Sequence, residues 1–175
     1  MLTARSPGYK RALLYRMYLL TMRGESMAWL PVRRWLLDQL LGRKHRQLNI
    51  FPQVFIEGIE GLTLGDNVSI NRDCNLSAAG GLAIGNDVSV AHSTSILTTE
   101  HSFSDLEHPI KEQAVTTANV AIADNVWIGA RAIILAGVSL ASGTIVAAGS
   151  VVKDSVADDN CTIAGVPARV VRRRN

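Results

Sequence analysis

The side chains best suited to acid–base chemistry are gathered in one short segment of the chain. His101 and His108, two of the four histidines, lie within residues 99–119, together with Glu100 and Asp105. A histidine titrates near neutral pH, so its ring can take a proton from a reacting hydroxyl. Such a ring needs an orienting partner, and either carboxylate is close enough in sequence to serve. The residues alone leave open whether these histidines are catalytic or belong to an exposed loop.

Other reactive residue types are too dispersed to indicate a familiar site. Cys74 and Cys161 form no Cys-x-x-Cys pair, so a disulfide framework is not expected. His45 follows a basic helical segment and is expected at the surface, whereas His92 is a weaker candidate for lining a cleft. The histidines lack the close spacing of zinc ligands, and no glycine-rich nucleotide motif occurs. We therefore expect no metal site.

The elements that must position these residues follow a period of six. Aliphatic residues recur every six positions in three runs, with a two-residue shift between the first two runs and a gap before the third. The thirteen positions are Leu64, Ile70, Leu76, Leu82, Ile84, Val90, Ile96, Ile122, Ile128, Ile134, Leu140, Val146 and Val152. Helices repeat at 3.6 residues and strands at 2, so neither alone gives this spacing. A short strand followed by a turn does, and stacked units of this kind bury one aliphatic column.

Three such units close a triangular coil, so residues 122–157 predict two full coils. Asp66-Asn67 and Asn86-Asp87 supply the turn-forming residues that the corners need. The aromatic content of 5% fits a column too narrow for rings. Residues 99–119 interrupt the repeat. A loop of roughly 20 residues that leaves a compact solenoid is unusual and often functional.

The chain before the repeat reads as two amphipathic helices over residues 8–42. Pro31 suits the first turn of the second helix, and Gly42 is a suitable end. Arg33 and Arg34 are expected on the solvent-facing stripe of that helix. Basic helices of this kind either cap the neighbouring domain, which we favour, or lie on a membrane surface.

The formal charge of +3 conceals a separation of charge along the chain. Residues 1–50 hold ten Lys and Arg against two acidic residues, a net of +8. Residues 51–167 have a net charge of −9, and residues 168–175 a net charge of +4. Basic ends on an acidic body indicate an anionic ligand or surface, although solvated arginines give the same pattern. No apolar run reaches the ~20 residues of a membrane span, and no signal-peptide pattern occurs, so we expect a cytoplasmic protein.

Three motifs join the hexads to a known family. Residues 126–130 (Val-Trp-Ile-Gly-Ala), 148–154 (Ala-Gly-Ser-Val-Val-Lys-Asp) and 164–169 (Ala-Gly-Val-Pro-Ala-Arg) resemble the hexapeptide-repeat acyltransferases, above all bacterial sugar and polysaccharide O-acetyltransferases. The resemblance covers about residues 55–172. It implies an all-β fold, a left-handed parallel β-helix, and a homotrimer with its active sites between subunits. It also implies transfer of an acetyl group from acetyl-CoA, a co-substrate that is not permanently bound, to a hydroxyl of a sugar or glycan precursor.

The resemblance assigns roles to individual residues. His101 matches the general base that follows the last strand before the loop, with Glu100 or Asp105 as its possible orienting group. Asn75, with Asp73 and Trp127, matches the acceptor-binding residues. The positions implied for acetyl-CoA are Gly129, Ala130, Ala147 and Ala148 along the pantetheine arm, and Lys153, Arg169 and Arg172 at the phosphates. No metal ligand is implied.

Several readings stay open at this point. We expect a basic helical extension over 1–50, a β-helix over 51–158 and a basic C-terminal cap over 159–175. A serine or xenobiotic O-acetyltransferase is an alternative within the same enzyme class, and a non-catalytic β-helix scaffold is an alternative outside it. No nucleic-acid partner is expected, whereas residues 1–50 are a candidate contact with the inner face of a membrane.

Overall fold

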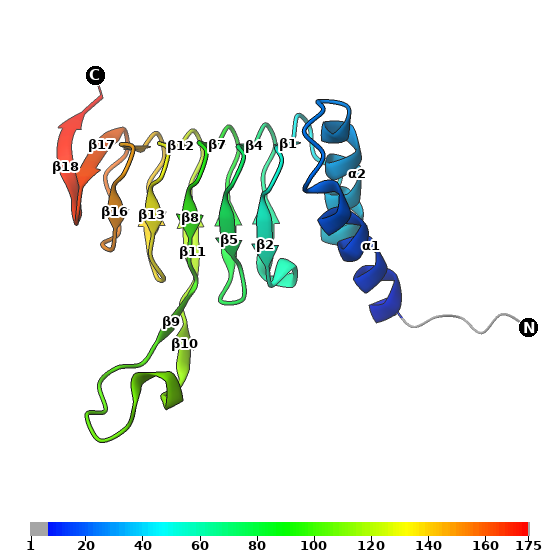
Figure 1. The fold of residues 1–175 in the computed structure, drawn as a ribbon. Helices are drawn as coiled ribbons and strands as arrows, with labels where there is room; N and C mark the ends of the chain where they lie inside the picture. Colours follow the sequence, from blue (N-terminus) through cyan, green and yellow to red (C-terminus); the bar gives the residue numbers. More distant parts are fainter. Residues whose placement is uncertain (1–6, 175) are drawn as a thin grey trace, which may run out of the picture.

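The computed structural model describes residues 7–174, whose backbone forms a three-sided parallel β-helix with two helices at one end (Figure 1). One side is a sheet of β1 (Asn49–Ile50), β4 (Ser69–Ile70), β7 (Ser89–Val90), β12 (Trp127–Ile128), β15 (Ile145–Val146) and β17 (Cys161–Gly165), closed by the antiparallel β18 (Ala168–Arg173). The second contains β2 (Phe55–Glu57), β5 (Asn75–Ser77), β8 (Ser95–Ile96), β13 (Ile133–Ile134) and β16 (Val151–Val152). The third contains β3 (Leu62–Leu64), β6 (Leu82–Ile84), β11 (Val120–Ile122) and β14 (Ser139–Leu140). The predicted parallel β-helix is therefore confirmed.

All thirteen aliphatic positions of the six-residue repeat are buried and form the central column. The two-residue shift in the sequence also has a structural explanation. In β6 both Leu82 and Ile84 point inward, because this strand is three residues long. Ser69 pairs with Ser89, whereas Trp127 pairs with Ile145, so a coil takes 20 residues before the loop and 18 after it.

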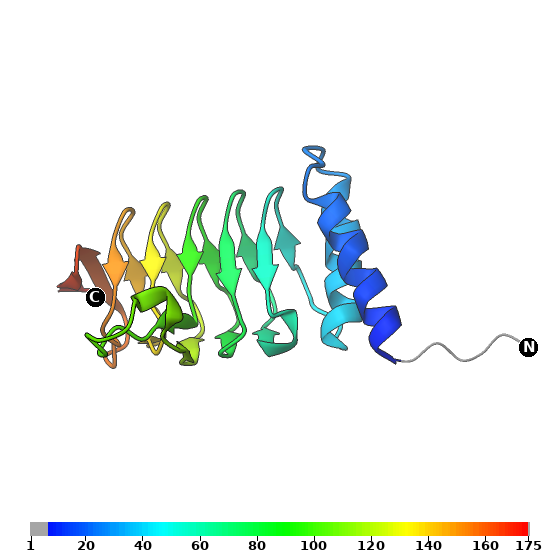
Figure 2. The same cartoon turned by 60° about the horizontal axis from the view of Figure 1, so that its bottom comes forward.

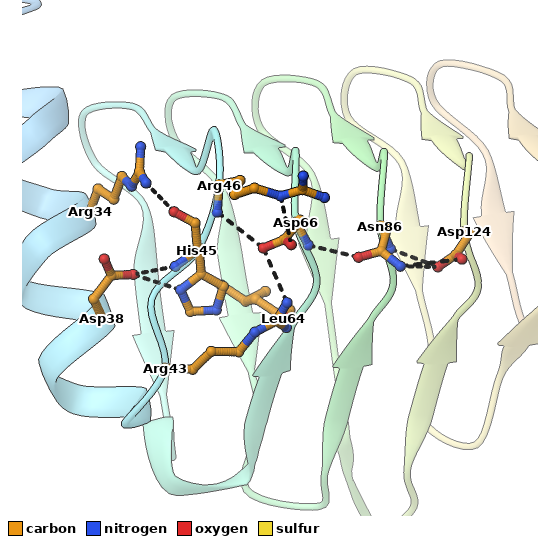
Figure 3. Close-up of polar contacts among 9 residues, drawn as sticks. All are labelled: Arg34, Asp38, Arg43, His45, Arg46, Leu64, Asp66, Asn86 and Asp124. Carbon is orange, nitrogen blue, oxygen red and sulfur yellow. Dashed lines mark hydrogen bonds and ion pairs between the residues drawn. The ribbon is translucent and has the colours of Figure 1, made fainter.

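One corner of the prism is held by a ladder of side chains that the sequence marked only as turns (Figure 3). The backbone amide of Arg46 donates to the carboxylate of Asp66 (3.0 Å), and the backbone amide of Asp66 donates to the side-chain oxygen of Asn86 (2.9 Å). The backbone amide of Asn86 in turn donates to the carboxylate of Asp124 (2.7 Å). The bond from the Arg46 amide, together with the guanidinium groups of Arg46 and Arg43, lowers the pKa of Asp66. Each side chain of this ladder thereby accepts a hydrogen bond from a backbone N–H of the neighbouring coil.

The two predicted helices are α1 (Pro7–Thr21) and α2 (Trp29–Leu41), and they cap the first coil of the solenoid (Figure 2). The hydroxyls of Tyr15 and Tyr18 donate to the carbonyls of Ile56 and Val54, each at 2.5 Å. Gly42 ends α2 with a φ of 67°, a left-handed conformation that glycine adopts without strain. The capping role that we favoured for these helices therefore describes their packing.

Two expectations for this region are wrong. Arg33 was expected in solvent but is 1% exposed, because it lies seven residues before Leu40 and so shares the buried face of α2. His45 was expected at the surface but is also 1% exposed. Its Nδ1 lies 2.7 Å from Asp38 Oδ1, and its carbonyl accepts a hydrogen bond from Arg34. A buried polar group of this kind needs partners, and the fold supplies them.

The interruption after β8 leaves the prism as an antiparallel arm made of β9 (Thr99–His101) and β10 (Val115–Thr117) (Figures 1 and 2). A short 3-10 helix, η2 (Ile110–Glu112), lies within the arm, and a second one, η1 (Ile59–Gly61), lies at a corner of the first coil. Four large apolar residues of the arm are exposed: Phe103, Leu106, Ile110 and Val115. The predicted extruded loop is thus an ordered hairpin with an uncovered apolar surface.

Candidate functional site

His101, the predicted general base, lies at the base of the arm with its ring exposed to solvent. It pairs in register with Val115, and the amide of Ser102 donates to the carbonyl of Ala114. The backbone of His101 is therefore fixed by the hairpin, while its imidazole is accessible to a ligand. This combination suits a base that must meet a substrate hydroxyl.

The two candidate orienting carboxylates lie differently. Asp105 Oδ2 is 2.9 Å from Nδ1 of His108, and its other oxygen accepts the amide of Glu107, so Asp105 holds the tip of the arm together. Glu100 precedes His101 in an extended strand, where neighbouring side chains point to opposite sides. The carboxylate of Asp105 is thus engaged by His108 and Glu107, and that of Glu100 lies on the other side of the strand from the His101 ring. An orienting group for His101 stays a prediction.

The acceptor-binding candidates lie on two different sides of the prism. Asn75 is exposed on β5 and pairs in register with Ser95 of β8, while Asp73 forms the preceding corner with a φ of 60°. Trp127 is 53% exposed on β12, which belongs to another sheet. Outward side chains of different sheets point in different directions. One chain therefore does not bring Asn75 and Trp127 to one surface.

The four small residues predicted along the pantetheine arm gather at one corner of two successive coils. The amide of Gly129 donates to Val146 and that of Gly149 to Ala130, each at 2.8 Å. A Cβ on Gly129 would lie 2.6 Å from the backbone nitrogen of Ala148. Packing between coils thus explains why a glycine is needed at position 129. At the same corner Ala148 is exposed, and Ala130 and Ala147 are half-buried.

Two of the three cations predicted for the CoA phosphates are brought together by the fold. Lys153 Nζ and Arg169 Nη1 each lie 2.9 Å from the carboxylate of Asp154, and these contacts lower the pKa of Asp154. Arg172 is exposed on β18, opposite Thr162. A small cavity of about 110 Å³ next to this group is lined in part by Asp154 and Arg169.

Sequence reasoning missed Asp154 as the group that positions these cations. Arg169 lies 15 residues from Asp154 in the chain, so only the closing hairpin of β17 and β18 shows the contact. Of the other C-terminal arginines, Arg173 lies 2.6 Å from Asp158, and Arg174 donates to the carbonyl of Gly143. These two fasten the end of the chain to the solenoid.

The chain has relatives of known type. The family model for the bacterial transferase hexapeptide (six repeats) matches residues 119–154. The putative colanic acid biosynthesis acetyltransferase WcaF of Escherichia coli K12 is 30% identical over 152 residues, which cover 84% of this chain and 80% of WcaF. The chain belongs to the hexapeptide-repeat acetyltransferases. The probable acetyltransferase Rv3034c of Mycobacterium tuberculosis is also 30% identical, and the chain spans only 43% of its length.

A solved structure of this family carries the donor. The hexapeptide-repeat acetyltransferase VCA0836 of Vibrio cholerae, in complex with acetyl-CoA, is 26% identical and superposes with a TM-score of 0.80 over 98% of this chain and 90% of its own. The resemblance that the three sequence motifs indicated is thereby confirmed. Within residues 7–174 no helix is long and apolar enough to cross a membrane, and no group of three His, Cys, Asp or Glu gathers as metal ligands would.

Proposed function

We propose that this hexapeptide-repeat acetyltransferase moves an acetyl group from acetyl-CoA to a hydroxyl of a sugar or glycan precursor. The observation that carries the proposal is the likeness, over almost the whole chain, to a family member solved with acetyl-CoA. The relative WcaF, named for colanic acid biosynthesis, supports a polysaccharide precursor as acceptor. The predicted cytoplasmic location remains part of the proposal, since Cys74 and Cys161 are both buried free thiols, as is usual in a reducing compartment.

In the proposed reaction His101 takes the proton from the acceptor hydroxyl. The hydroxyl oxygen attacks the thioester carbonyl of acetyl-CoA, the new C–O bond forms and the C–S bond breaks. The proton then passes from the imidazole to the leaving sulfur, so free CoA and the acetyl ester are the products. The exposed ring on a fixed hairpin backbone supports this role.

The proposed binding site for acetyl-CoA runs along the solenoid towards its C-terminal end. Lys153, Arg169 and Arg172 neutralise the CoA phosphates, and the exposed face beside Trp127 and Ala148 accepts the pantetheine arm. Asp154 holds two of these cations in place. On binding, phosphate oxygens replace part of the contact of Lys153 and Arg169 with Asp154.

We further propose that the complete site is built between neighbouring copies in a homotrimer. Asn75 and Trp127 lie on different sides of one prism, so a second prism is needed to bring both beside one ligand. The uncovered apolar residues of the arm support such packing, because Leu106 is 94% exposed in one chain.

Release of free thiol from acetyl-CoA with a panel of sugar acceptors tests the proposal. His101→Ala should reduce turnover by about 10²- to 10⁴-fold, the usual contribution of a general base. His108→Gln is the matched control on the same arm and should retain activity. Full activity of His101→Ala would contradict the assigned base, and transfer only to serine or a xenobiotic would favour those alternatives. If calorimetry detects no binding of CoA to the chain, the result would favour a non-catalytic β-helix scaffold.

A further inference from the structure

The outer side of α1 carries a stripe of large apolar side chains. Leu13, Met17 and Leu20 follow one another at spacings of four and three residues, and they are 46%, 41% and 80% exposed. Tyr18 lies on the opposite side of the helix, where its hydroxyl reaches the carbonyl of Val54 in the first coil. The stripe therefore points away from the solenoid.

The second helix repeats this arrangement. Leu36, Leu37 and Leu40 are buried on the side of α2 that packs against the first coil. Trp35 lies on the other side of the helix and is 51% exposed, and Val32 lies at the flank of the buried side and is 38% exposed. Trp29, at the start of α2, is also exposed. Both helices thus carry exposed apolar and aromatic side chains. The helices themselves close the N-terminal end of the solenoid (Figure 1).

Cations outnumber acidic residues around this surface, where Glu25 is exposed in the turn after α1 and lies 3.8 Å from Arg72. Lys10 and Arg16 are exposed on either side of the α1 stripe, and α1 contains no acidic residue. Arg11 and Arg23 add two further exposed cations. The solenoid behind the cap is acidic, with a net charge of −9 over residues 51–167. Charge therefore changes sign along the long axis: it is positive at the helical cap, negative along the solenoid and positive again at the C-terminal strand β18.

We infer that the outer side of this cap, formed by Leu13, Met17, Leu20, Trp29, Val32 and Trp35 with the surrounding Lys and Arg residues, docks on an anionic phospholipid membrane. Apolar side chains enter the boundary between headgroups and acyl chains, while the cations contact lipid phosphates. Tryptophan favours this interface, since its ring is apolar and its N–H still finds a polar partner.

The positive charge of the cap favours a membrane, rather than a second copy of the chain, as the binding partner of this surface. Two caps placed face to face would bring like charges together, which disfavours self-association through this surface. An anionic bilayer attracts the cap and repels the acidic solenoid, so the long axis stands away from the membrane. Parallel prisms in the proposed trimer would place three caps at one end and strengthen the contact. The inference itself requires neither the trimer nor the proposed activity.

Flotation of the full chain with lipid vesicles tests this inference. The protein should float with vesicles of phosphatidylcholine mixed with phosphatidylglycerol, and should remain behind with phosphatidylcholine alone. Joint substitution of Leu13→Gln and Leu20→Gln should weaken binding by at least about tenfold, because two apolar side chains no longer enter the interface. Lys10→Gln with Arg16→Gln should weaken it by a similar factor, at about fivefold for each lost cation.

Matched controls lie away from the cap. Val171→Gln removes an apolar side chain of β18 that is 59% exposed, and Lys111→Gln removes an exposed cation of the arm, so neither should alter flotation. Quenching of tryptophan fluorescence by bromine-labelled lipids should report entry of Trp29 and Trp35 into the interface. Circular dichroism confirms that each variant keeps its helices.

Three results would overturn the inference: no flotation of the unaltered chain with anionic vesicles, equal flotation of the Leu13→Gln, Leu20→Gln variant, or no quenching by bromine-labelled lipids. Loss of self-association in that variant, measured by sedimentation without any vesicle binding, would instead assign the surface to a second copy. Because flotation needs no turnover, failure here leaves the proposed activity standing, and loss of turnover leaves this inference standing.

Discussion

At the scale of single residues, Arg33 connects three parts of the chain. Its guanidinium donates to the carbonyls of Thr21 (2.6 Å), Gly24 (2.5 Å) and Ile50 (3.2 Å), and so joins the two helices to β1. Burial lowers the pKa of Arg33, because the charged form loses its water. The three carbonyls replace that water at Nη1 and Nη2, whereas the buried Nε has no hydrogen-bond partner.

Arg33→Met should therefore destabilise the protein by about 2–4 kcal/mol, since the carbonyls of Gly24 and Ile50 lose this donor inside the fold, whereas that of Thr21 keeps the amide of Gly24. Urea unfolding followed by circular dichroism measures the change. Arg16→Met, on the exposed side of α1, should change the free energy of unfolding by less than about 0.5 kcal/mol. Similar values for the two variants would show that Arg33 holds no essential contact.

Tyr18 provides a second test at this scale. It is fully buried, and burial raises the pKa of its hydroxyl well above the ordinary value of about 10. A group whose pKa is raised on folding stabilises the fold up to its unfolded pKa, and this stability is lost as the pH rises towards the folded pKa. Stability should therefore fall above about pH 10, by up to about 1.4 kcal/mol per pH unit from this residue.

Tyr18→Phe cannot ionise and should show a shallower decline over the same pH range, although it loses the hydrogen bond to Val54. Urea titrations of both proteins at a series of alkaline pH values give the two slopes. Parallel curves would mean that another group controls alkaline unfolding.

At the scale of elements, the distance between successive coils decides where a side chain fits. Gly129→Ala should destabilise the solenoid by about 1–3 kcal/mol, because its Cβ would lie 2.6 Å from the backbone of Ala148. Gly8→Ala is the opposite case, since open space surrounds this helical residue. It should leave stability unchanged or raise it by up to about 1 kcal/mol. Thermal unfolding of the pair compares them, and equal shifts would contradict the packing argument.

The closing hairpin of β17 and β18 supplies the next prediction. Lys153→Gln combined with Arg169→Gln should raise KM for acetyl-CoA by about tenfold or more, because charge-assisted contacts to phosphate are lost. Turnover at saturating donor should change less. Arg173→Gln is the control, since Arg173 is fastened to Asp158. Steady-state kinetics at varied acetyl-CoA separates these effects, and an unchanged KM would remove both residues from the donor site.

At the scale of the whole molecule, the separation of Asn75 and Trp127 on different sides of the prism leads to a test of assembly. If the site is shared between copies, Trp127→Ala and Asn75→Ala chains should each lose most of their activity alone. Co-expressed in one cell, they should regain part of the wild-type activity, because some interfaces then hold both native residues. No recovery in mixed assemblies verified by mass spectrometry would mean that one chain supplies both.

Local sequence determined the solenoid. Each inward position of the column needs only an aliphatic residue, and each corner a residue that tolerates a left-handed backbone, as Asn67, Asp87 and Asn125 do with φ between 55° and 58°. Both requirements are met within six residues, so the period and its interruption by the loop could be predicted. The two helices could be predicted because the spacing of their apolar residues is also local. The three motifs also led to the family. Handedness and site roles came with the resemblance rather than with the period.

The tertiary structure decided everything that depends on residues far apart in the chain. Arg33 is buried because three carbonyls converge on it, and a charged residue in isolation suggests the opposite. Arg169 reaches Asp154, 15 residues earlier in the chain, because the last strand reverses its direction. A six-residue repeat specifies which side chains point inward. It does not specify which residues contact one another on the outer surface of the prism, where binding and chemistry take place. Those residues come from different coils, from the cap and from the arm.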